Sequence, residues 1–488
     1  MDDSDIERTA TGEASSYRRI LWATSLVGGA TLTALVIGLA RNKAVALVGG
    51  PSAVGLLGLF TALVSMVASI STVGLDTSGV RQLSQQHSRP VHAARTKRAI
   101  WTMAWPLAIL GGSATWFLRK PLASFSAADS GYAAAVGVLG IGVAASVIGA
   151  VQVAVLQGSE RVADVARVKI WGSLAATTIG VLAVYFLGVA GIVIAVIATP
   201  LATCLFSFAF GRGLPGSDWS RLFEAKLGDQ WRTLALIGAV VTVTNVVASL
   251  GLLSTRALIT HRLGLASAGL YHASWSIASV NLSLVLNAMA ADYFPRVSKV
   301  ADEPGSMSAI LNQQIHVALL LAGPVLTFVS LLAPVVLTIL YSSAFSGSAL
   351  LLRLLLAAGV LRLPIWALGY ILLARRAPAF YFLGEVAAAS IVPLTWLLLP
   401  AYGLTGAAIA AVLSALFSLF FYLVPVHRSH GVRLSAENGK TIALLVCVLL
   451  ATAVLFEVST MAGLVTGLGA ALALSWRCSR QLRLALAA

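Results

Sequence analysis

Cationic side chains at the ends of apolar segments are the residues of this sequence best suited to chemistry. Arg41 and Arg256 lie 215 residues apart, each at the end of an apolar segment, and Lys43 and Arg262 follow them closely. A guanidinium stays charged and presents five N–H donors in a planar fork that matches carboxylate or phosphate oxygens. The four cations therefore predict an anion-binding cavity, with Arg41 and Arg256 as its principal ligands. The alternative is that they only anchor helix ends at a membrane surface by snorkelling.

Two further charges lie deeper within apolar segments. Arg362 is near the middle of the segment 348–373, and Glu385 is in the segment 379–400. A charge at that depth costs at least ~2.5–3.5 kcal/mol on insertion scales, so Arg362 is expected to face the interior, as a cavity cation or paired with Glu385. Arg353 lies nine residues before Arg362 and faces the opposite side of a helix. We expect Arg353 to snorkel towards the nearer surface.

An acidic residue precedes a basic one at the ends of two apolar segments. Asp76 lies near the end of one segment and Arg81 follows it, and Asp292 and Arg296 follow another segment. Opposite charges at these equivalent places predict a charge-paired gate at the inner end of a cavity. Asp292 and Arg296 are spaced i, i+4, so a simple pair along one helix is the alternative for them. Asp76 and Arg81 are five residues apart and pair less naturally.

The composition excludes several classes of protein. Only 10% of the 488 residues are charged and 58% are apolar, against about 25% charged in soluble domains. A soluble enzyme and a disordered chain are therefore excluded. The net charge of +15 is spread over short loops, which argues against nucleic-acid binding. We expect no catalytic residues, no metal and no cofactor, since Cys204, Cys447 and Cys478 show no zinc or disulfide spacing.

Apolar stretches of membrane-spanning length recur along the whole chain and indicate an all-α polytopic membrane protein. The spans are expected near 20–40, 52–79, 99–118, 132–157, 170–188, 191–210, 233–255, 268–291, 313–340, 348–373, 379–400, 404–426, 441–456 and 460–475. Fourteen spans are expected. The alternative is twelve, because the last two are each shorter than the ~20 residues of a straight span.

Lysine and arginine residues are distributed unevenly between the two sides. Of the 33, 25 fall on the side that holds the N-terminus and six on the other. Such a bias marks the cytoplasmic side, so both termini are expected there. The resulting divisions are a cytoplasmic tail 1–17, a six-helix lobe 18–212, a cytoplasmic connector 213–232, a second six-helix lobe 233–426, a transmembrane hairpin 441–475 and a cytoplasmic tail 476–488.

The chain also contains two similar halves. The stretch Gly50–Leu56 resembles Gly264–Leu270, and Gly188–Gly191 resembles Gly403–Gly406. Three arginines meet another arginine 215 residues later: Arg41, Arg81 and Arg161. Because each half has an even number of helices, the repeat is parallel, with a pseudo-twofold axis along the membrane normal. The expected substrate site is a central cavity between the halves.

Four motifs follow one another between Leu21 and Ser84: Thr24–Gly29, Arg41–Ala46, Gly50–Gly58 and Gly79–Ser84. In this order they resemble the O-antigen and related polysaccharide flippases of the multidrug, oligosaccharidyl-lipid and polysaccharide (MOP) exporter superfamily. Glycine-rich turns before the sixth and twelfth spans extend the likeness over about residues 18–426.

The resemblance implies translocation of an undecaprenyl-diphosphate-linked oligosaccharide, such as an O-antigen repeat unit, by alternating access. The substrate would move from the inner to the outer leaflet of a bacterial inner membrane, and the first, second, seventh and eighth spans would line the cavity. Besides this substrate and membrane lipids, a polysaccharide polymerase and a chain-length regulator would be the partners.

Other transported substrates are the alternatives. A drug/cation antiporter of the same superfamily relies on buried acids, and no Asp or Glu occurs from Arg18 to Leu75. A peptidoglycan lipid-precursor flippase would share the fourteen spans. A membrane glycosyltransferase or polymerase would need a large extramembrane loop, whereas the longest connector here is 211–232.

Overall fold

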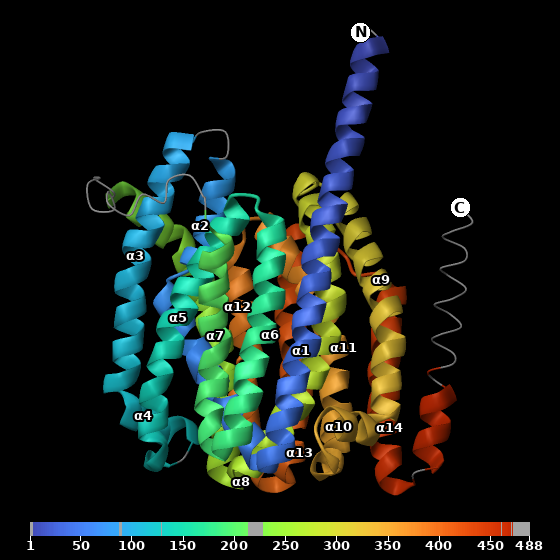
Figure 1. The fold of residues 1–488 in the computed structure, drawn as a ribbon. Coiled ribbons are helices and arrows are strands. Elements are labelled where there is room, and N and C mark those ends of the chain that lie inside the picture. The colour runs from blue at the N-terminus through green and yellow to red at the C-terminus, as the bar shows by residue number, and fades with distance from the viewer. Residues whose placement is uncertain are drawn as a thin grey trace.

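A computed structural model describes residues 3–86, 90–127, 129–212, 228–459, 461–469 and 471. Over these residues the chain forms a bundle of long helices that run up and down a common direction (Figure 1). The first half contains α1 (Asp3–Thr72), α2 (Leu75–Gln85), α3 (Pro90–Phe117), α4 (Arg119–Ala127), α5 (Ala133–Gly158), α6 (Val162–Leu187) and α7 (Gly191–Phe210). The second half contains α8 (Gly228–Lys299), α9 (Pro304–Leu331), α10 (Ala333–Leu340), α11 (Ala349–Ala374), α12 (Pro378–Ala388), α13 (Ile391–His430) and α14 (Ala436–Val458).

Four glycines turn the chain at one end of the bundle, called here the glycine-turn end; the opposite end is the connector end. Gly50 interrupts α1 with φ 63° and ψ −160°, and Gly264 interrupts α8 with φ 84° and ψ 171°. Gly188 joins α6 to α7 with φ 58° and ψ −132°, and Gly403 interrupts α13 with φ 54° and ψ −143°. Only glycine adopts such angles without strain. The matching angles at equivalent positions confirm the two parallel halves.

Eight stretches of the described helices are long and apolar enough to cross a membrane, which confirms the all-α polytopic fold. Four of them fold back at one of these glycines and form two legs each: Leu26–Thr72, Val162–Phe210, Thr242–Ser283 and Pro378–His430. The total of fourteen spans stays a prediction. Residues 461–469 are helical, but the connector residues 213–227 and the tail residues 472–488 lie outside the described residues.

Two loops expected from the sequence are helical instead. Residues 41–49 continue the first leg of α1, and residues 256–263 continue the first leg of α8. Charged side chains mark the end of each apolar run, but the positive φ angles of Gly50 and Gly264 end the helices. The prediction of the span ends was therefore wrong by about two helical turns.

The two halves touch along α1 and α8 near the glycine-turn end. Gly55 packs against the backbone of Leu265, and Gly269 packs against the backbone of Pro51, so neither position has room for a Cβ atom. Glycine is needed wherever two backbones approach this closely. These contacts hold the halves together at that end of the bundle.

Helix α14 packs against α9 and α11 and covers Arg353. This side chain is buried; its Nε donates to the Ser330 carbonyl oxygen at 3.1 Å, and its guanidinium lies 3.8 Å from the centre of the Phe456 ring. The expectation that Arg353 snorkels was therefore wrong. Its cation–π partner comes from a helix more than a hundred residues later, which the local sequence does not show.

Candidate functional site

Each half of the bundle contains a cavity between its own helices. The first-half cavity has a volume of about 580 Å³ and is bounded by both legs of α1 and by α5, α6 and α7. The second-half cavity has a volume of about 620 Å³ and is bounded by α8, α11, α12 and α13. Both lie within a half, whereas the sequence led us to expect a substrate cavity between the halves.

The first-half cavity is cationic. Its polar lining consists of two cations and seven hydroxyl side chains: Arg41, Lys169, Thr31, Thr61, Ser65, Ser146, Ser173, Thr199 and Thr203. Among the described residues that line it there is no Asp or Glu. The cavity therefore carries positive charge at membrane depth without an acidic partner in its wall.

Arg41 reaches from α1 across this cavity to α7. Its Nη1 donates to the Thr199 hydroxyl at 2.5 Å and to the Ala195 carbonyl oxygen at 3.2 Å. Gly180 of α6 makes space for the arginine, because a Cβ atom there would lie 3.2 Å from both Arg41 Cδ and Ala195 Cβ. Three helices thus position the side chain that the sequence singled out.

Lys169 is a second cation of this cavity, and the sequence did not predict it there. The expected span began at residue 170, which left Lys169 in a cytoplasmic loop, whereas α6 begins at Val162. The side chain lies two helical turns inside α6, and its Nζ donates to the Thr31 hydroxyl of α1 at 2.9 Å.

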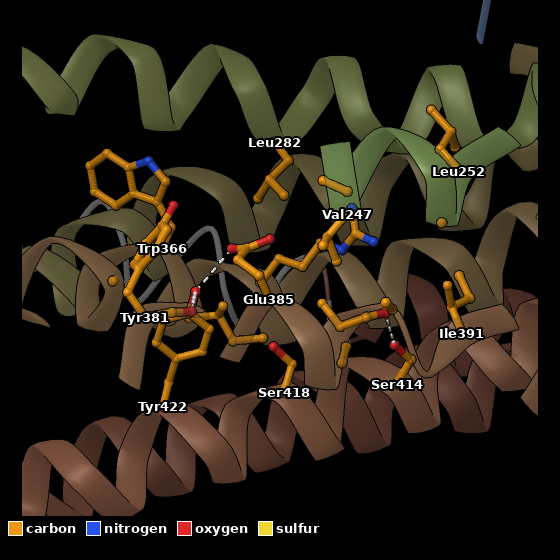
Figure 2. Close-up of a pocket in the computed structure, with 18 of the residues that line it drawn as sticks. Val247, Leu252, Leu282, Trp366, Tyr381, Glu385, Ile391, Ser414, Ser418 and Tyr422 are labelled. Atoms are coloured by element: carbon orange, nitrogen blue, oxygen red, sulfur yellow. Dashed lines mark hydrogen bonds between the residues drawn. The ribbon is translucent and has the colours of Figure 1, made fainter. Parts of the chain in front are cut away.

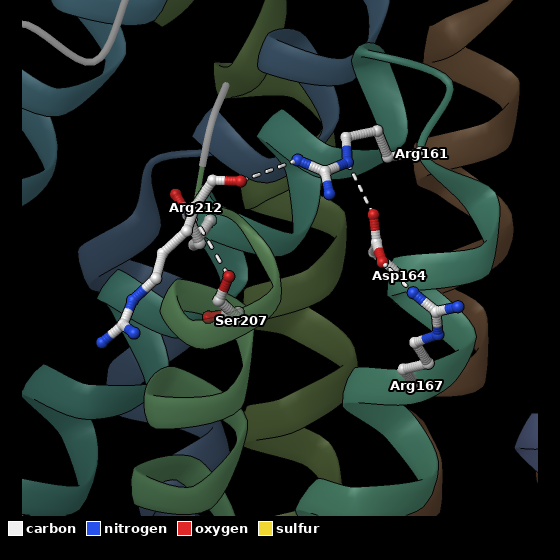
Figure 3. Close-up of polar contacts among 6 residues, drawn as sticks. Arg161, Asp164, Arg167, Ser207 and Arg212 are labelled. Carbon is white, nitrogen blue, oxygen red and sulfur yellow. Dashed lines mark hydrogen bonds and ion pairs between the residues drawn. The ribbon is translucent and has the colours of Figure 1, made fainter. Parts of the chain in front are cut away.

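An ion-pair cluster at the start of α6 could have revealed this boundary. Asp164 lies in the first turn, and its two carboxylate oxygens accept from Arg161 at 2.6 Å and from Arg167 at 2.9 Å (Figure 3). An acidic side chain in the first turn of a helix interacts favourably with the helix dipole and is typical of a helix start. Arg161 also donates to the Arg212 carbonyl oxygen at 3.4 Å, which ties this end of α6 to the end of α7.

The second-half cavity is aromatic and contains one acid and one base. Its lining includes Tyr271, Trp275, Trp366, Tyr370, Tyr381, Tyr422, Arg362 and Glu385. Glu385 accepts a hydrogen bond from the Tyr422 hydroxyl at 2.9 Å, and Trp366 and Tyr381 stand beside them (Figure 2). The Arg362 guanidinium lies 4.5 Å from the centre of the Trp275 ring.

Arg362 therefore faces the interior and shares a cavity with Glu385, but each has another close partner. Among the ion pairs of the described residues, none joins the two side chains. The direct pair expected from the sequence is not formed in this conformation. The Arg362 guanidinium lies over the Trp275 ring, and the Glu385 carboxylate accepts a hydrogen bond from the Tyr422 hydroxyl.

The helix that carries Glu385 is broken next to it. α12 ends at Ala388 and α13 begins at Ile391, within what the sequence predicted as one span. Ser414 donates to the Ala388 carbonyl oxygen at 2.7 Å, so a hydroxyl from the next leg satisfies a backbone group at the break. Broken helices at membrane depth are tolerated where they line a cavity.

The two cavities are equivalent in the repeat but differ in charge. Thr199 and Thr203 correspond to Ser414 and Ser418 at the offset of 215. Lys169 corresponds at the same offset to Gly384, the residue before Glu385. One scaffold therefore carries a cation in the first half and a carboxylate one position away in the second.

The remaining expected cavity cations lie elsewhere. Arg256 is buried, and its Nη1 donates to the Gly58 carbonyl oxygen of the other half at 2.6 Å. Lys43 donates to the carbonyl oxygen of Ile339 at the glycine-turn end, again across the halves. Arg262 is exposed. Arg41 and Arg256 thus have different surroundings although the repeat makes them equivalent.

The expected gate residues form one pair. Arg296 pairs with Asp292 at 3.1 Å along α8 and also donates to Gln313 at 2.9 Å. Asp76 and Arg81 both line a further pocket of about 520 Å³ against α5. No ion pair joins these two side chains among the described residues.

Comparisons with known proteins agree with this architecture. Residues 47–350 match a family described as "Polysaccharide biosynthesis protein". The chain is 24% identical to the Lipid III flippase of Escherichia coli (strain K12) over 402 residues, which cover 80% of this chain and 92% of that protein.

Among solved structures, an inward-facing multidrug resistance MATE family transporter of the MOP superfamily superimposes with a TM-score of 0.69. It is 15% identical and covers 84% of this chain and 95% of its own. The Lipid II flippase MurJ, in an inward closed conformation, gives a TM-score of 0.68 at 13% identity, over 94% of this chain and 99% of its own. The fold is therefore that of the MOP superfamily transporters.

Proposed function

The chain belongs to the polysaccharide biosynthesis protein family, and we propose that it is a flippase for an oligosaccharide linked to an undecaprenyl-diphosphate carrier. The substrate would be an O-antigen or related surface-polysaccharide repeat unit. It would move from the inner to the outer leaflet of a bacterial inner membrane. The membrane transporter fold is common to the structures named above, and the E. coli relative is a Lipid III flippase.

The observation that carries this proposal is the cationic first-half cavity. Arg41 is held inside a membrane-spanning bundle by Thr199 and the Ala195 carbonyl, and no acidic residue lines its cavity within the described residues. A cation at membrane depth is costly unless a counter-charge is supplied. A diphosphate supplies that charge, and a guanidinium matches its oxygens bidentately.

A cavity inside the bundle also suits a lipid-linked sugar. Unpaired polar groups cost several kcal/mol each in hydrocarbon, so a glycan cannot cross the bilayer unaided. The carrier chain would stay in the lipid while the head group passes along hydroxyl-lined helices. An inside-negative potential favours outward movement of the negative charges by ~2.3 kcal/mol per charge per 100 mV. Outward transport would then proceed without ATP.

The topology of this proposal has both termini in the cytoplasm, so the connector end faces the cytoplasm. A polysaccharide polymerase and a chain-length regulator would receive the substrate on the outer side. Reporter fusions after Lys440 should report the cytoplasm, and fusions near Glu457 should report the outside, because α14 connects the two positions. A cytoplasmic signal near Glu457 would reduce the protein to twelve spans.

Two measurements test the function. A strain that lacks the protein should accumulate lipid-linked oligosaccharide in mass spectra, and proteoliposomes that contain the protein should expose that lipid in the opposite leaflet. Unchanged lipid pools together with loss of cationic-dye extrusion would favour a drug/cation antiporter. Accumulation of peptidoglycan lipid precursors in place of polysaccharide intermediates would favour a precursor flippase.

A further inference from the structure

The two cations of the first-half cavity lie at different depths. Lys169 contacts Thr31, and Arg41 is ten residues further along the same leg of α1. At 1.5 Å per residue these levels are about 15 Å apart, or half the hydrocarbon thickness of a bilayer. Two phosphates that share a bridging oxygen are much closer together than these two backbone levels, which favours separate contacts of the diphosphate with Lys169 and with Arg41.

We propose that Lys169 and Arg41 are two successive binding stations for the diphosphate of a lipid-linked substrate. Lys169 is the station nearer the connector end, and Arg41 is the station nearer the glycine-turn end. The inference rests on the proposed flippase function, and it adds a residue, Lys169, and an order of contacts. It also confines the path of the phosphates to the first half.

Neither station has an acidic partner in the described structure. The acidic residue closest to Lys169 along α6 is Asp164, and both of its oxygens are occupied by Arg161 and Arg167 (Figure 3). The lining of the cavity contributes hydroxyl groups but, among the described residues, no carboxylate. An anion that enters the cavity can therefore pair with either station without competition from a carboxylate in the described lining.

Both stations retain N–H groups for a ligand. Arg41 uses Nη1 for Thr199 and Ala195, whereas its Nη2 makes no hydrogen bond to the described residues. Lys169 carries three N–H bonds on Nζ, and one of them is donated to Thr31. Charge-assisted bonds from such donors to phosphate oxygens are roughly twice as strong as neutral ones.

Hydroxyl groups fill the distance between the stations. Ser173 lies one helical turn beyond Lys169 on α6, towards Arg41. Thr203 lies one turn from Thr199 on α7, towards Lys169. A phosphate that leaves one station therefore meets polar side chains before it reaches the next.

The second half offers no equivalent track. Gly384 stands at the position of Lys169, and the adjacent Glu385 would repel a phosphate. Arg256 stands at the position of Arg41 but is bonded to the Gly58 carbonyl oxygen. The phosphate track is therefore one-sided, although the scaffold is duplicated.

Binding and transport should respond differently to substitution of the stations. The experiment uses the purified full chain in nanodiscs, with undecaprenyl diphosphate as probe and undecaprenol as its uncharged match, and native mass spectrometry as the readout. If either station can hold the lipid, Lys169→Met or Arg41→Met should weaken binding by only about twofold, and the double variant should lose the preference for the diphosphate. Flipping in proteoliposomes should fall by about tenfold or more in each single variant.

The controls separate this inference from the proposed function. Lys169→Arg should restore flipping because it keeps the charge, and Lys120→Met, on an exposed cation of α4, should leave binding and flipping unchanged. Complete loss of binding in one single variant would overturn the two stations in favour of one joint site. Normal flipping by Lys169→Met would also overturn the two stations but would leave the proposed flippase function standing. A wild-type protein that neither binds the diphosphate nor flips the substrate would overturn the proposed function itself.

Discussion

The two cavities show how one duplicated scaffold acquires two chemistries. The first-half cavity places Arg41 and Lys169 among hydroxyl groups, and the second-half cavity places Glu385 and Arg362 among tyrosine and tryptophan rings. The hydroxyls at Thr199 and Ser414 are shared between the halves, so the helix packing is retained while the charges have changed. The backbone repeat therefore determines where a cavity forms, and a few side chains determine its ligand.

The difference extends to the equivalent arginines. Arg41 reaches into a cavity, whereas Arg256 crosses to the Gly58 carbonyl of the other half. A guanidinium serves either purpose, because it can donate to a phosphate or to a backbone oxygen. Equivalence in a repeat is thus evidence for the position of a side chain in the fold and does not establish a common role.

Removal of Arg41 should have the largest effect on glycan export, because it removes a cation from the first-half cavity. Arg41→Ala should reduce surface glycan by about tenfold or more, since a charge-assisted contact with the diphosphate is lost. Arg41→Lys should retain partial export, because it keeps the charge without the fork. Glycan blots at matched expression measure the effect, with Lys120→Ala as the control. Near-normal glycan export by Arg41→Ala would remove the first-half cavity from substrate binding.

Substitutions in the second-half cavity should be less damaging to anion binding. Glu385→Gln keeps an acceptor for the Tyr422 hydroxyl and should leave diphosphate binding within about twofold. Glu385→Ala leaves that hydroxyl with the Tyr381 carbonyl oxygen at 3.3 Å as its remaining acceptor, at a cost of about 1 kcal/mol. Because Arg362 and Glu385 share one cavity, the double alanine variant should lose less stability than the sum of the single variants. Thermal unfolding measures this, and strictly additive losses would show that the two side chains do not interact.

Arg256→Ala should affect stability more than ligand binding. The variant loses the bond to Gly58 between the halves, and we expect a decrease in unfolding free energy of about 1–3 kcal/mol. Arg256→Lys retains a donor and should recover part of it. Melting curves and diphosphate binding would be measured on the same preparations. A large loss of binding at an unchanged melting temperature would instead assign Arg256 to the substrate site.

The smallest effect is expected from Gly180→Ala, which tests whether the position of the Arg41 side chain matters for flipping. The added Cβ lies 3.2 Å from Arg41 Cδ, so the side chain must shift by a few tenths of an ångström. We expect flipping to fall by about twofold to fivefold. The unfolding free energy should fall by about 1 kcal/mol, because the added Cβ also meets Ala195. Gly28→Ala is the matched control, because a Cβ at Gly28 meets no atom within 4 Å. Equal flipping rates in the two variants would show that Arg41 tolerates the displacement.

Much of the fold could be predicted from local sequence. Hydropathy located the legs of α5, α7 and α11 to within a few residues, because each must cover the apolar thickness of a bilayer with its own residues. The glycine-rich turns expected before the sixth and twelfth spans are present at Gly188 and Gly403, which adopt angles that other residues avoid. The depth of Arg362 also predicted that it faces the interior. Each of these features depends on the residues of one segment and not on the segment's neighbours in the bundle.

Only the tertiary structure decided which charged groups share a cavity. Arg41 meets Thr199 from 158 residues away, and Lys169 meets Thr31 from 138 residues away. Hydropathy shows that a helix spans the membrane but does not determine its neighbours or its rotation, because lipid-facing and helix-facing sides are both apolar. For the same reason the sequence could not show that α14 covers Arg353 or that the Tyr422 hydroxyl donates a hydrogen bond to Glu385. These partners are determined by lateral packing, in which small residues such as Gly55 and Gly269 determine how closely two helices approach.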